Sequence, residues 1–297
     1  MGAKLRVVRR RIRSVQSTMK ITRAMELIAA SRILRAQARV VAARPYAELL
    51  TRAMEDVARQ TGRLVHPLLE ERPEPRAAGV LVMTSDRGLA GAYNANVLKR
   101  AEDLMDRLRG RGLELVLYVS GRKGVSYFRF RGLPVERSWT GHSEVPPYHV
   151  AEEIGAEVVR AFSERRIDEL HAVYTDFRSA FTIRPTDKRF LPIAPEEVVA
   201  GEPGRPHPEY LFEPAPAAIL DDLLPQYVTT KIYAGLLESA ASEHAARQRA
   251  MKSATENAED LIKVLTRVAN QARQAEITTE IMEVVGGAEA IRQAAGE

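Results

Sequence analysis

The sequence predicts an α/β fold combined with a long antiparallel coiled coil, in which the N- and C-terminal helices pair and a central Rossmann-like α/β domain lies between them in the chain. Both ends carry apolar residues at heptad spacing over tens of residues. The middle alternates short apolar runs with amphipathic stretches, which is typical of a mostly parallel sheet covered by helices. We therefore expect a first helix over residues 1–60, an α/β domain over 76–200 and a last helix over 217–287.

The first helix is predicted from residue 4 to about 58, with apolar residues at spacings of three and four. The seam continues through Thr22 and Glu26 into small residues that permit close helix contact. Pro45 should kink the helix or end its straight part. The positions that begin the seam are Leu5, Val8, Ile12, Val15 and Met19.

Other faces of this helix are also apolar around residues 21–28. Ile21, Met25, Leu27 and Ile28 lie outside the seam. A helix that is apolar nearly all round is normally enclosed by protein. We expect this stretch to contact its partner helix and a second neighbour.

Charge is distributed unevenly along the chain. Residues 1–44 hold twelve Lys or Arg and one acid, Glu26, whereas the whole chain is only +5. Without acids for i,i+4 pairing these cations repel one another, so an acidic external surface is expected opposite them. Nucleic acid is a poor candidate for that surface, because Leu5, Val8, Ile12 and Val15 run an apolar seam through the same region.

The α/β domain is expected between two linkers rich in Pro and Gly, residues 62–76 and 195–216. Its strands are predicted at 78–84, 114–120, 133–139 and 169–178, with an edge strand at 184–193. Its helices are predicted at 92–109 and 148–164, with a short helix after Gly121 and Gly124.

One long helix is predicted from about 217 to 286. Pro225 should kink it or start its main part, and Gly286–Gly287 is expected to end it. Its seam follows spacings of four and three at Leu261, Leu265, Val268, Ala272, Ala275, Thr279 and Met282. Because the α/β domain joins the two long helices at one end, they should pair antiparallel.

Several chemistries are not expected. The chain has no cysteine, which excludes disulfides and thiolate sites and fits a reducing cytosol, and its six His show no metal-ligand spacing. No apolar run of about 18 residues is present, and the N-terminus lacks the apolar core of a signal peptide. The loop 84–94 contains Gly88 and Gly91 but matches neither phosphate-binding fingerprint, so we interpret it as a structural turn. Asp86 and Arg87 are interpreted as a helix-capping Asp and a surface Arg. We expect no catalytic, metal-binding or cofactor-binding residues.

Long stretches of the chain resemble the gamma subunit family of bacterial F-type ATP synthases. The matching stretches are ITRAMELIAASR (21–32), ARPYAE (43–48), TSDRGLAGAYN (84–94), SGRKG (120–124), YLFEPAP (210–216) and the segment from SEHAARQRAMK to IMEVVGGA (242–288). The resemblance implies a non-catalytic central rotor shaft at the cytoplasmic face of the cell membrane. It implies α and β subunits around the coiled coil, with the epsilon subunit and the c-ring at the α/β foot, and no cofactor.

The resemblance also implies which residues make those contacts. Lys20, Arg23 and Met25 match shaft positions that face the β subunits, as do Arg273, Gln274, Thr278 and Glu280 near the C-terminus. Val284, Val285 and Ala288 match the apolar bearing of the hexamer, and Tyr210 matches the foot near epsilon and the c-ring. Two other functions stay open: a coiled-coil scaffold with an α/β head, and a nucleotide-binding enzyme that uses the loop 84–94.

Overall fold

The computed structural model describes residues 3–61, 66–179, 182–194 and 216–294. The chain forms two compact units. One, the α/β unit, comprises Ala29–Arg247. The other, the helix-pair unit, combines residues 1–28 with 248–297. Both long helices belong partly to each unit.

The α/β unit contains a five-stranded sheet of order β3-β2-β1-β4-β5. The first four strands are parallel, and β5 pairs antiparallel with β4. The edge position of β5 is the one that the prolines in its sequence predicted. The strands are β1 (Ala77–Met83), β2 (Glu114–Ser120), β3 (Arg137–Trp139), β4 (Glu169–Phe177) and β5 (Ile183–Leu191). The predicted third strand at 133–139 is shorter than expected.

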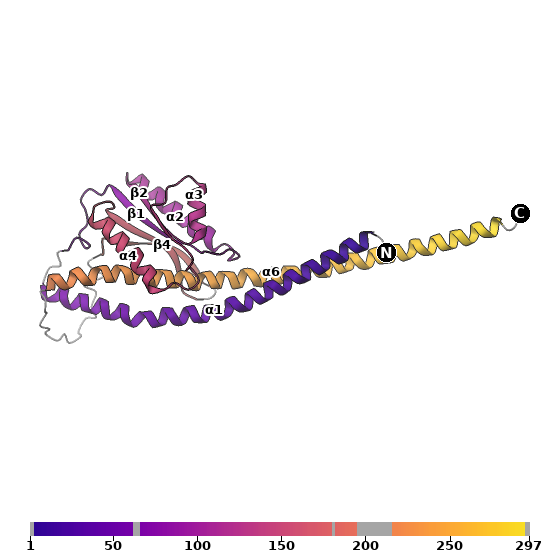
Figure 1. The fold of residues 1–297 in the computed structure, drawn as a ribbon, viewed down its shortest axis with the longest axis horizontal. Coiled ribbons are helices and arrows are strands. Elements are labelled where there is room, and N and C mark those ends of the chain that lie inside the picture. The colour runs from indigo at the N-terminus through magenta and orange to yellow at the C-terminus, as the bar shows by residue number, and fades with distance from the viewer. Residues whose placement is uncertain (1–2, 62–65, 180–181, 195–215, 295–297) are drawn as a thin grey trace. The chain divides into compact units, whose positions relative to one another are not determined.

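Helices cover both faces of this sheet (Figure 1). Helices α2 (Tyr93–Gly110) and α3 (Arg122–Phe130) pack on one face, where Val80, Val82 and Val173 point. Helix α4 (Tyr148–Ser163) and the first part of α6 pack on the other, against Leu81 and Met83. The α/β prediction is therefore confirmed, and the first part of α6 belongs to the core of the α/β unit.

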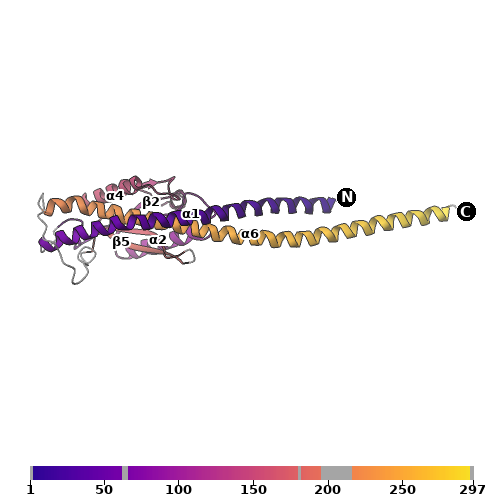
Figure 2. The same ribbon diagram turned by 90° about the horizontal axis from the view of Figure 1, so that it is seen from below.

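The two long helices, α1 (Ala3–Thr61) and α6 (Pro216–Ala294), lie side by side and antiparallel within each unit (Figures 1 and 2). In the helix-pair unit, the hydroxyls of Thr22 and Thr255 share a hydrogen bond of 2.8 Å. In the α/β unit, the Tyr46 hydroxyl donates to Gln226 (3.1 Å). The predicted antiparallel coiled coil is confirmed.

Helix α1 does not end at Pro45 and α6 does not start at Pro225, while the kinks predicted as the alternative at both prolines stay predictions. The predicted stop at Gly286–Gly287 is wrong, because α6 continues to Ala294. An interior proline costs about 3 kcal/mol. Around Pro225 that cost is offset because Leu224 and Val228, on either side of it, are both buried in one core. A glycine in a helix interior lowers helix stability by about 1 kcal/mol relative to alanine. Gly286 and Gly287 together do not end α6.

The predicted seam of α1 is confirmed. Leu5 is buried and Val8, Ile12, Val15 and Met19 are half-buried, while most positions between them are exposed. The heptad then continues through Thr22, Glu26, Ala29 and Ile33, all buried.

The predicted seam of α6 needs correction. Leu261 is partly exposed, and Ala275, Thr279 and Met282 are exposed. The buried or half-buried register instead runs through Thr255, Ala258, Ile262, Leu265, Ala269 and Ala272. Both registers have heptad spacing and share Leu265 and Ala272, so spacing alone could not separate them. The pairing of Thr255 with Thr22 decides between them.

The linker predicted at 195–216 lies almost entirely outside the described residues. The predicted division into the segments 1–60, 76–200 and 217–287 stays a prediction. The two compact units are a different division of the chain, with boundaries inside α1 and α6.

A buried carboxylate on α4 predicts acid sensitivity of the α/β unit. Glu157 is buried and accepts hydrogen bonds from Arg137, Arg160 and Arg166 at 2.7, 2.5 and 3.1 Å. Burial alone would raise its pKa, but the three guanidinium donors lower the pKa of Glu157 to about 2 from an ordinary 4.5. The stabilisation is therefore complete above about pH 4.5 and is lost as the pH falls through about 2.

We expect Glu157→Gln to lower the free energy of unfolding by about 2 kcal/mol at pH 7. The difference from the wild type should shrink between pH 4.5 and 2, measured by urea unfolding across that range. Glu164→Gln, at a half-exposed partner of Arg160 and Arg166, serves as the control and should change stability little. A difference for Glu157→Gln that is constant with pH would contradict the assignment.

Candidate functional site

The α1 part of the helix-pair unit exposes both apolar and basic side chains. Ile21, Leu27 and Ile28 are each more than half exposed, and Met25 is half-buried. Lys20 and Arg23 are exposed beside them. The seam accounts for the buried positions of this helix, so these side chains form a surface that no described part of the helix-pair unit covers.

Charge on this surface is only partly compensated. Arg23 pairs with Glu26 at 2.9 Å, and Glu26 is nearly buried in the seam. No ion pair involving Lys20 occurs among the described residues of the unit. The surface therefore keeps a positive field that favours an acidic partner.

The C-terminal part of α6 is exposed on all sides. Every side chain from 277 to 288 is exposed, including Thr278, Glu280, Val284, Val285 and Ala288. Arg273 and Gln274 are exposed one turn earlier. Val284 is 72% exposed and Val285 61%. An exposed apolar stretch of this kind marks an interaction site.

The structure separates the predicted site residues into two groups. Thr22 is at the level of Thr255, so Lys20, Arg23 and Met25 lie near that level. Arg273 lies about 27 Å further along α6, at 1.5 Å per residue. The α1 group and the α6 group therefore address different levels of any partner. Tyr210, the predicted foot residue, lies outside the described residues.

The loop 84–94 in the α/β unit makes structural contacts in the described chain, which fits the predicted structural turn. Asp86 accepts backbone N–H bonds from Ser143 (2.9 Å) and from Arg122 (3.1 Å), the first residue of α3. Burial would raise the pKa of Asp86, but these donors lower it. Asp86 thus caps α3 rather than the helix that follows it, and Arg87 is exposed, as predicted.

Helix α6 occupies the place where a doubly wound sheet usually binds a ligand. In such folds the ligand crevice lies outside the carboxyl ends of the strands, where the strand order reverses. Here that point is between β1 and β4. Ser242 on α6 donates to the Thr175 carbonyl of β4 (3.3 Å), and Arg247 donates to the Gly88 carbonyl after β1 (3.3 Å). Side chains of α6 therefore fill the crevice that a nucleotide would need.

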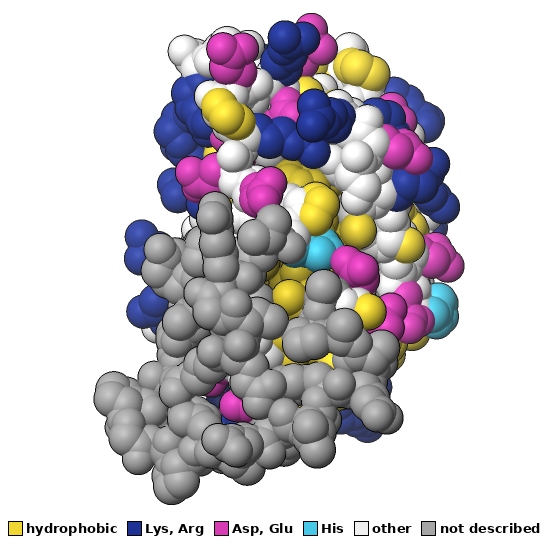
Figure 3. All heavy atoms as spheres, turned by 90° about the vertical axis from the view of Figure 1, so that its left-hand side faces the viewer, with side chains coloured by type: hydrophobic (Ala, Val, Ile, Leu, Met, Phe, Trp, Pro, Cys, Tyr) yellow, Lys and Arg dark blue, Asp and Glu magenta, His cyan; other side chains and the backbone are white. Residues whose placement is uncertain are grey.

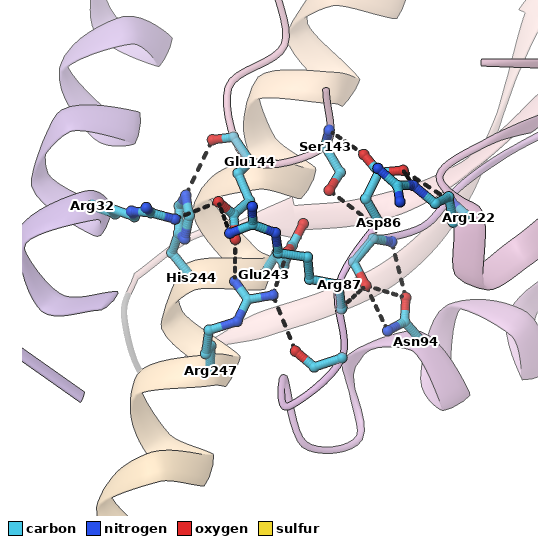
Figure 4. Close-up of polar contacts among 12 residues, drawn as sticks. Arg32, Asp86, Arg87, Asn94, Arg122, Ser143, Glu144, Glu243, His244 and Arg247 are labelled. Atoms are coloured by element: carbon cyan, nitrogen blue, oxygen red, sulfur yellow. Dashed lines mark hydrogen bonds and ion pairs between the residues drawn. The ribbon is translucent and has the colours of Figure 1, made fainter. Parts of the chain in front are cut away.

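A cluster of charged residues, which we call the Glu144 junction, lies beside this crevice (Figure 4). Glu144, in the loop before α4, contacts Arg32 of α1, Arg247 of α6 at 3.5 Å and Arg87 at 3.6 Å. Arg247 also donates to Glu243 at 2.5 Å. His244 donates from Nε2 to the Glu144 carbonyl at 3.1 Å.

Burial sets the electrostatics of the junction. Glu243 is 1% exposed, and Arg247 is buried beside it. Burial raises the pKa of Glu243, while the Arg247 guanidinium opposes that rise. Burial also lowers the pKa of His244, which favours the neutral ring that bonds the Glu144 carbonyl. Removing one partner would leave a buried charge uncompensated.

Sequence reasoning missed the junction. Arg32 and Arg247 lie 112 and 103 positions from Glu144, and no spacing motif joins them. The available signal was the group Glu243, His244 and Arg247, because the other positions from 239 to 246 are Ala or Ser. Small neighbours imply close packing, where charged residues need partners.

The face of the molecule drawn in Figure 3 has a mixed surface. Basic, acidic and hydrophobic side chains are interspersed over the parts of that face that are not grey. This pattern differs from the apolar stretches of the helix-pair unit. Within the described residues, no helix has the length and apolar character to cross a membrane.

Comparisons with known proteins agree on one family. The sequence model of the family described as ATP synthase matches residues 4–291. The ATP synthase gamma chain of Acidothermus cellulolyticus is 56% identical over 98% of both chains. That of Mycolicibacterium smegmatis is 53% identical over 98% of this chain and 99% of the relative. A chain in the mitochondrial ATP synthase structure of Euglena gracilis (OSCP, F1 and c-ring) shares the fold, with a TM-score of 0.66 at 16% identity over 98% of this chain and 95% of that one.

Proposed function

Because this chain belongs to the ATP synthase gamma chain family, and is thereby a non-catalytic subunit of that enzyme complex, we propose that it acts as the central-stalk rotor of a proton-translocating F-type ATP synthase. Rotation of the c-ring would turn this chain, and the turning helix pair would drive the catalytic β subunits through their conformational cycle. The observation that carries the proposal is the exposed apolar and basic surface of the helix-pair unit. Such a surface needs a protein around it.

The partners follow from the character of each surface. One copy of the helix pair would stand inside a hexamer of α and β subunits, and the α/β unit would face the epsilon subunit and the c-ring. Tyr210 is assigned to that foot by family resemblance alone. The chain would reach the membrane only through the complex, at the cytoplasmic face of the bacterial cell membrane. It requires no cofactor and no nucleic acid for this role.

The two groups of site residues receive different roles. Lys20, Arg23 and Met25 would face the moving parts of the β subunits, where positive charge gives a long-range attraction that tolerates sliding. The α6 group would act about 27 Å away. There Arg273, Gln274, Thr278 and Glu280 would make polar contacts, and Val284, Val285 and Ala288 would turn in an apolar bearing.

Reconstitution tests the proposal. The chain is mixed with purified α and β subunits from the same source, a bead is attached to the α/β unit, and single complexes are imaged during ATP hydrolysis. We expect one copy per hexamer and unidirectional rotation of the bead. Failure to incorporate, or incorporation without rotation, would favour the scaffold function instead. Stable self-association of the isolated chain would point the same way.

The nucleotide-binding alternative has its own test. Equilibrium dialysis of the isolated chain against ATP and NAD should detect no binding, because Ser242 and Arg247 of α6 occupy the crevice at the switch point of the sheet. Saturable binding of either nucleotide would contradict this interpretation of the crevice.

A further inference from the structure

We propose that Glu144 is the joint that fixes both long helices to the α/β domain, so that torque applied to that domain reaches α1 as well as α6. The inference rests on the rotor function proposed above. It assigns a positioning role to Glu144 and Arg32 that neither the family resemblance nor the comparisons give.

Helix α6 and α1 differ in how firmly they are attached to the sheet. Leu224, Val228 and Ile232 of α6 are fully buried in the core beneath the sheet. Helix α1 contributes Met54 and Val57 to the same core, near its C-terminal end. Close-packed apolar contacts of this kind transmit strain. The core beneath the sheet therefore holds the first part of α6 over several turns, from Leu220 to Leu236, and α1 at Met54 and Val57.

Between that end and Arg32, α1 borders a cavity. Val40, Ala43 and Ala47 of α1 line a space of about 460 Å³, with Tyr148 of α4 and Tyr233 of α6 opposite. The missing packing contacts leave this stretch of α1 less constrained than a filled core would. Beside this space, Tyr46 is exposed and its hydroxyl donates to Gln226 of α6. A charged contact, the ion pair of Arg32 with Glu144, joins α1 to the loop before α4.

Glu144 meets both helices with one carboxylate. Its Oε2 pairs with Arg32 of α1, and its Oε1 lies 3.5 Å from Arg247 of α6. The backbone is held too, because His244 of α6 donates to the Glu144 carbonyl. Figure 4 shows Arg32 and Arg247 approaching Glu144 from the two helices. A single loop residue therefore ties α1 and α6 to the same point of the domain.

The loop that carries Glu144 is itself anchored. The neighbouring Ser143 exchanges two hydrogen bonds with Asp86, donating its N–H to the carboxylate (2.9 Å) and accepting the Asp86 N–H on its hydroxyl (2.8 Å). Asp86 in turn caps α3. Force can thus be transmitted from α3 and the end of β1, through Ser143 and Glu144, to both long helices. In sequence, the two helix residues that contact Glu144 lie close to the unit boundaries: Arg32 shortly after 28–29, and Arg247 at 247–248.

The test measures torsional stiffness in the assembled complex. Complexes of α and β subunits with the wild type, Glu144→Gln or Arg32→Met are immobilised, and the angular variance of a bead on the α/β domain is recorded during the ATP-waiting pause. Arg35→Met is the matched control, since Arg35 is an exposed α1 arginine with no ion pair among the described residues. The melting temperature of each isolated chain is measured in parallel.

We expect Glu144→Gln and Arg32→Met to raise the angular variance by about twofold, because α1 would lose its attachment at Glu144 and keep its packed contacts at Met54 and Val57. Arg35→Met should leave the variance unchanged. Arg32→Met should raise the variance at a melting temperature close to the wild type, because it removes a half-exposed side chain. If Glu144→Gln fails to fold, Arg32→Met alone carries the test. Unchanged variance in Arg32→Met would overturn the joint. A wild-type complex that does not rotate would instead overturn the rotor function.

Discussion

Replacing Gly121 by alanine is expected to lower the free energy of unfolding of the α/β unit by about 4 kcal/mol. Gly121 has φ of +97°, a region that L-residues rarely adopt. A Cβ atom there would lie 2.1 Å from the Thr84 carbonyl oxygen at the end of β1. Since Gly121 directly precedes α3 and follows β2, the chain cannot move away without disturbing β1, β2 and the helix start together. Urea unfolding followed by circular dichroism measures the loss.

Gly141→Ala is the matched control for this substitution. Gly141 has nearly the same φ, +99°, but a Cβ there meets nothing within 4 Å. Gly141→Ala should therefore lower the free energy of unfolding only by the backbone strain, about 1–2 kcal/mol. Equal losses for the two variants would show that strain, and not the close approach to Thr84, explains why glycine is needed at 121.

Replacing Met25 by lysine is expected to lower ATP-driven proton pumping about tenfold for each ATP hydrolysed, with hydrolysis retained. Met25 is half-buried, one helical turn from the exposed Ile21 and Ile28. Under the proposed rotor function, the new ammonium would be desolvated against the β subunits, at a cost of several kcal/mol. A tenfold effect needs only about 1.4 kcal/mol. Pumping by membrane vesicles is measured beside ATP hydrolysis.

Ser17→Lys controls for charge alone, because Ser17 is a fully polar, exposed position about two turns earlier on α1. It should leave the ratio of pumping to hydrolysis near the wild-type value. The isolated Met25→Lys chain should unfold like the wild type, since a half-buried lysine can extend its ammonium into water. A normal pumping ratio in Met25→Lys would remove Met25 from the proposed contact.

The strands and helices of the α/β unit were predictable because their signals are local. The apolar run at 114–120 is the strand β2 at the predicted bounds, and the edge position of β5 followed from its prolines. The continuation of α6 through Pro225 and Gly286–Gly287 was not predictable in the same way. The local costs of these residues are a few kcal/mol, and burial of residues on both sides, as around Pro225, can exceed them.

The candidate site was predicted in part. The seam of α1 and the surplus apolar residues Ile21, Leu27 and Ile28 were visible as periodicity, and the structure leaves those three exposed. The α6 residues were assigned by resemblance, and whether they contact β subunits stays a prediction. The Glu144 junction was not predicted, because the spacing of charged residues along the chain does not indicate which residues they will contact.

The sequence by itself determined that two heptad-patterned helices flank an α/β domain and that the first helix is strongly basic, since both are properties of neighbouring residues along the chain. Only the tertiary structure decided the register of α6, the filling of the switch-point crevice by Ser242 and Arg247, and the meeting of Arg32 with Glu144. Each of these depends on residues at least 67 positions apart. Heptad spacing allows several registers, and an ion pair can form only after packing has brought its partners together.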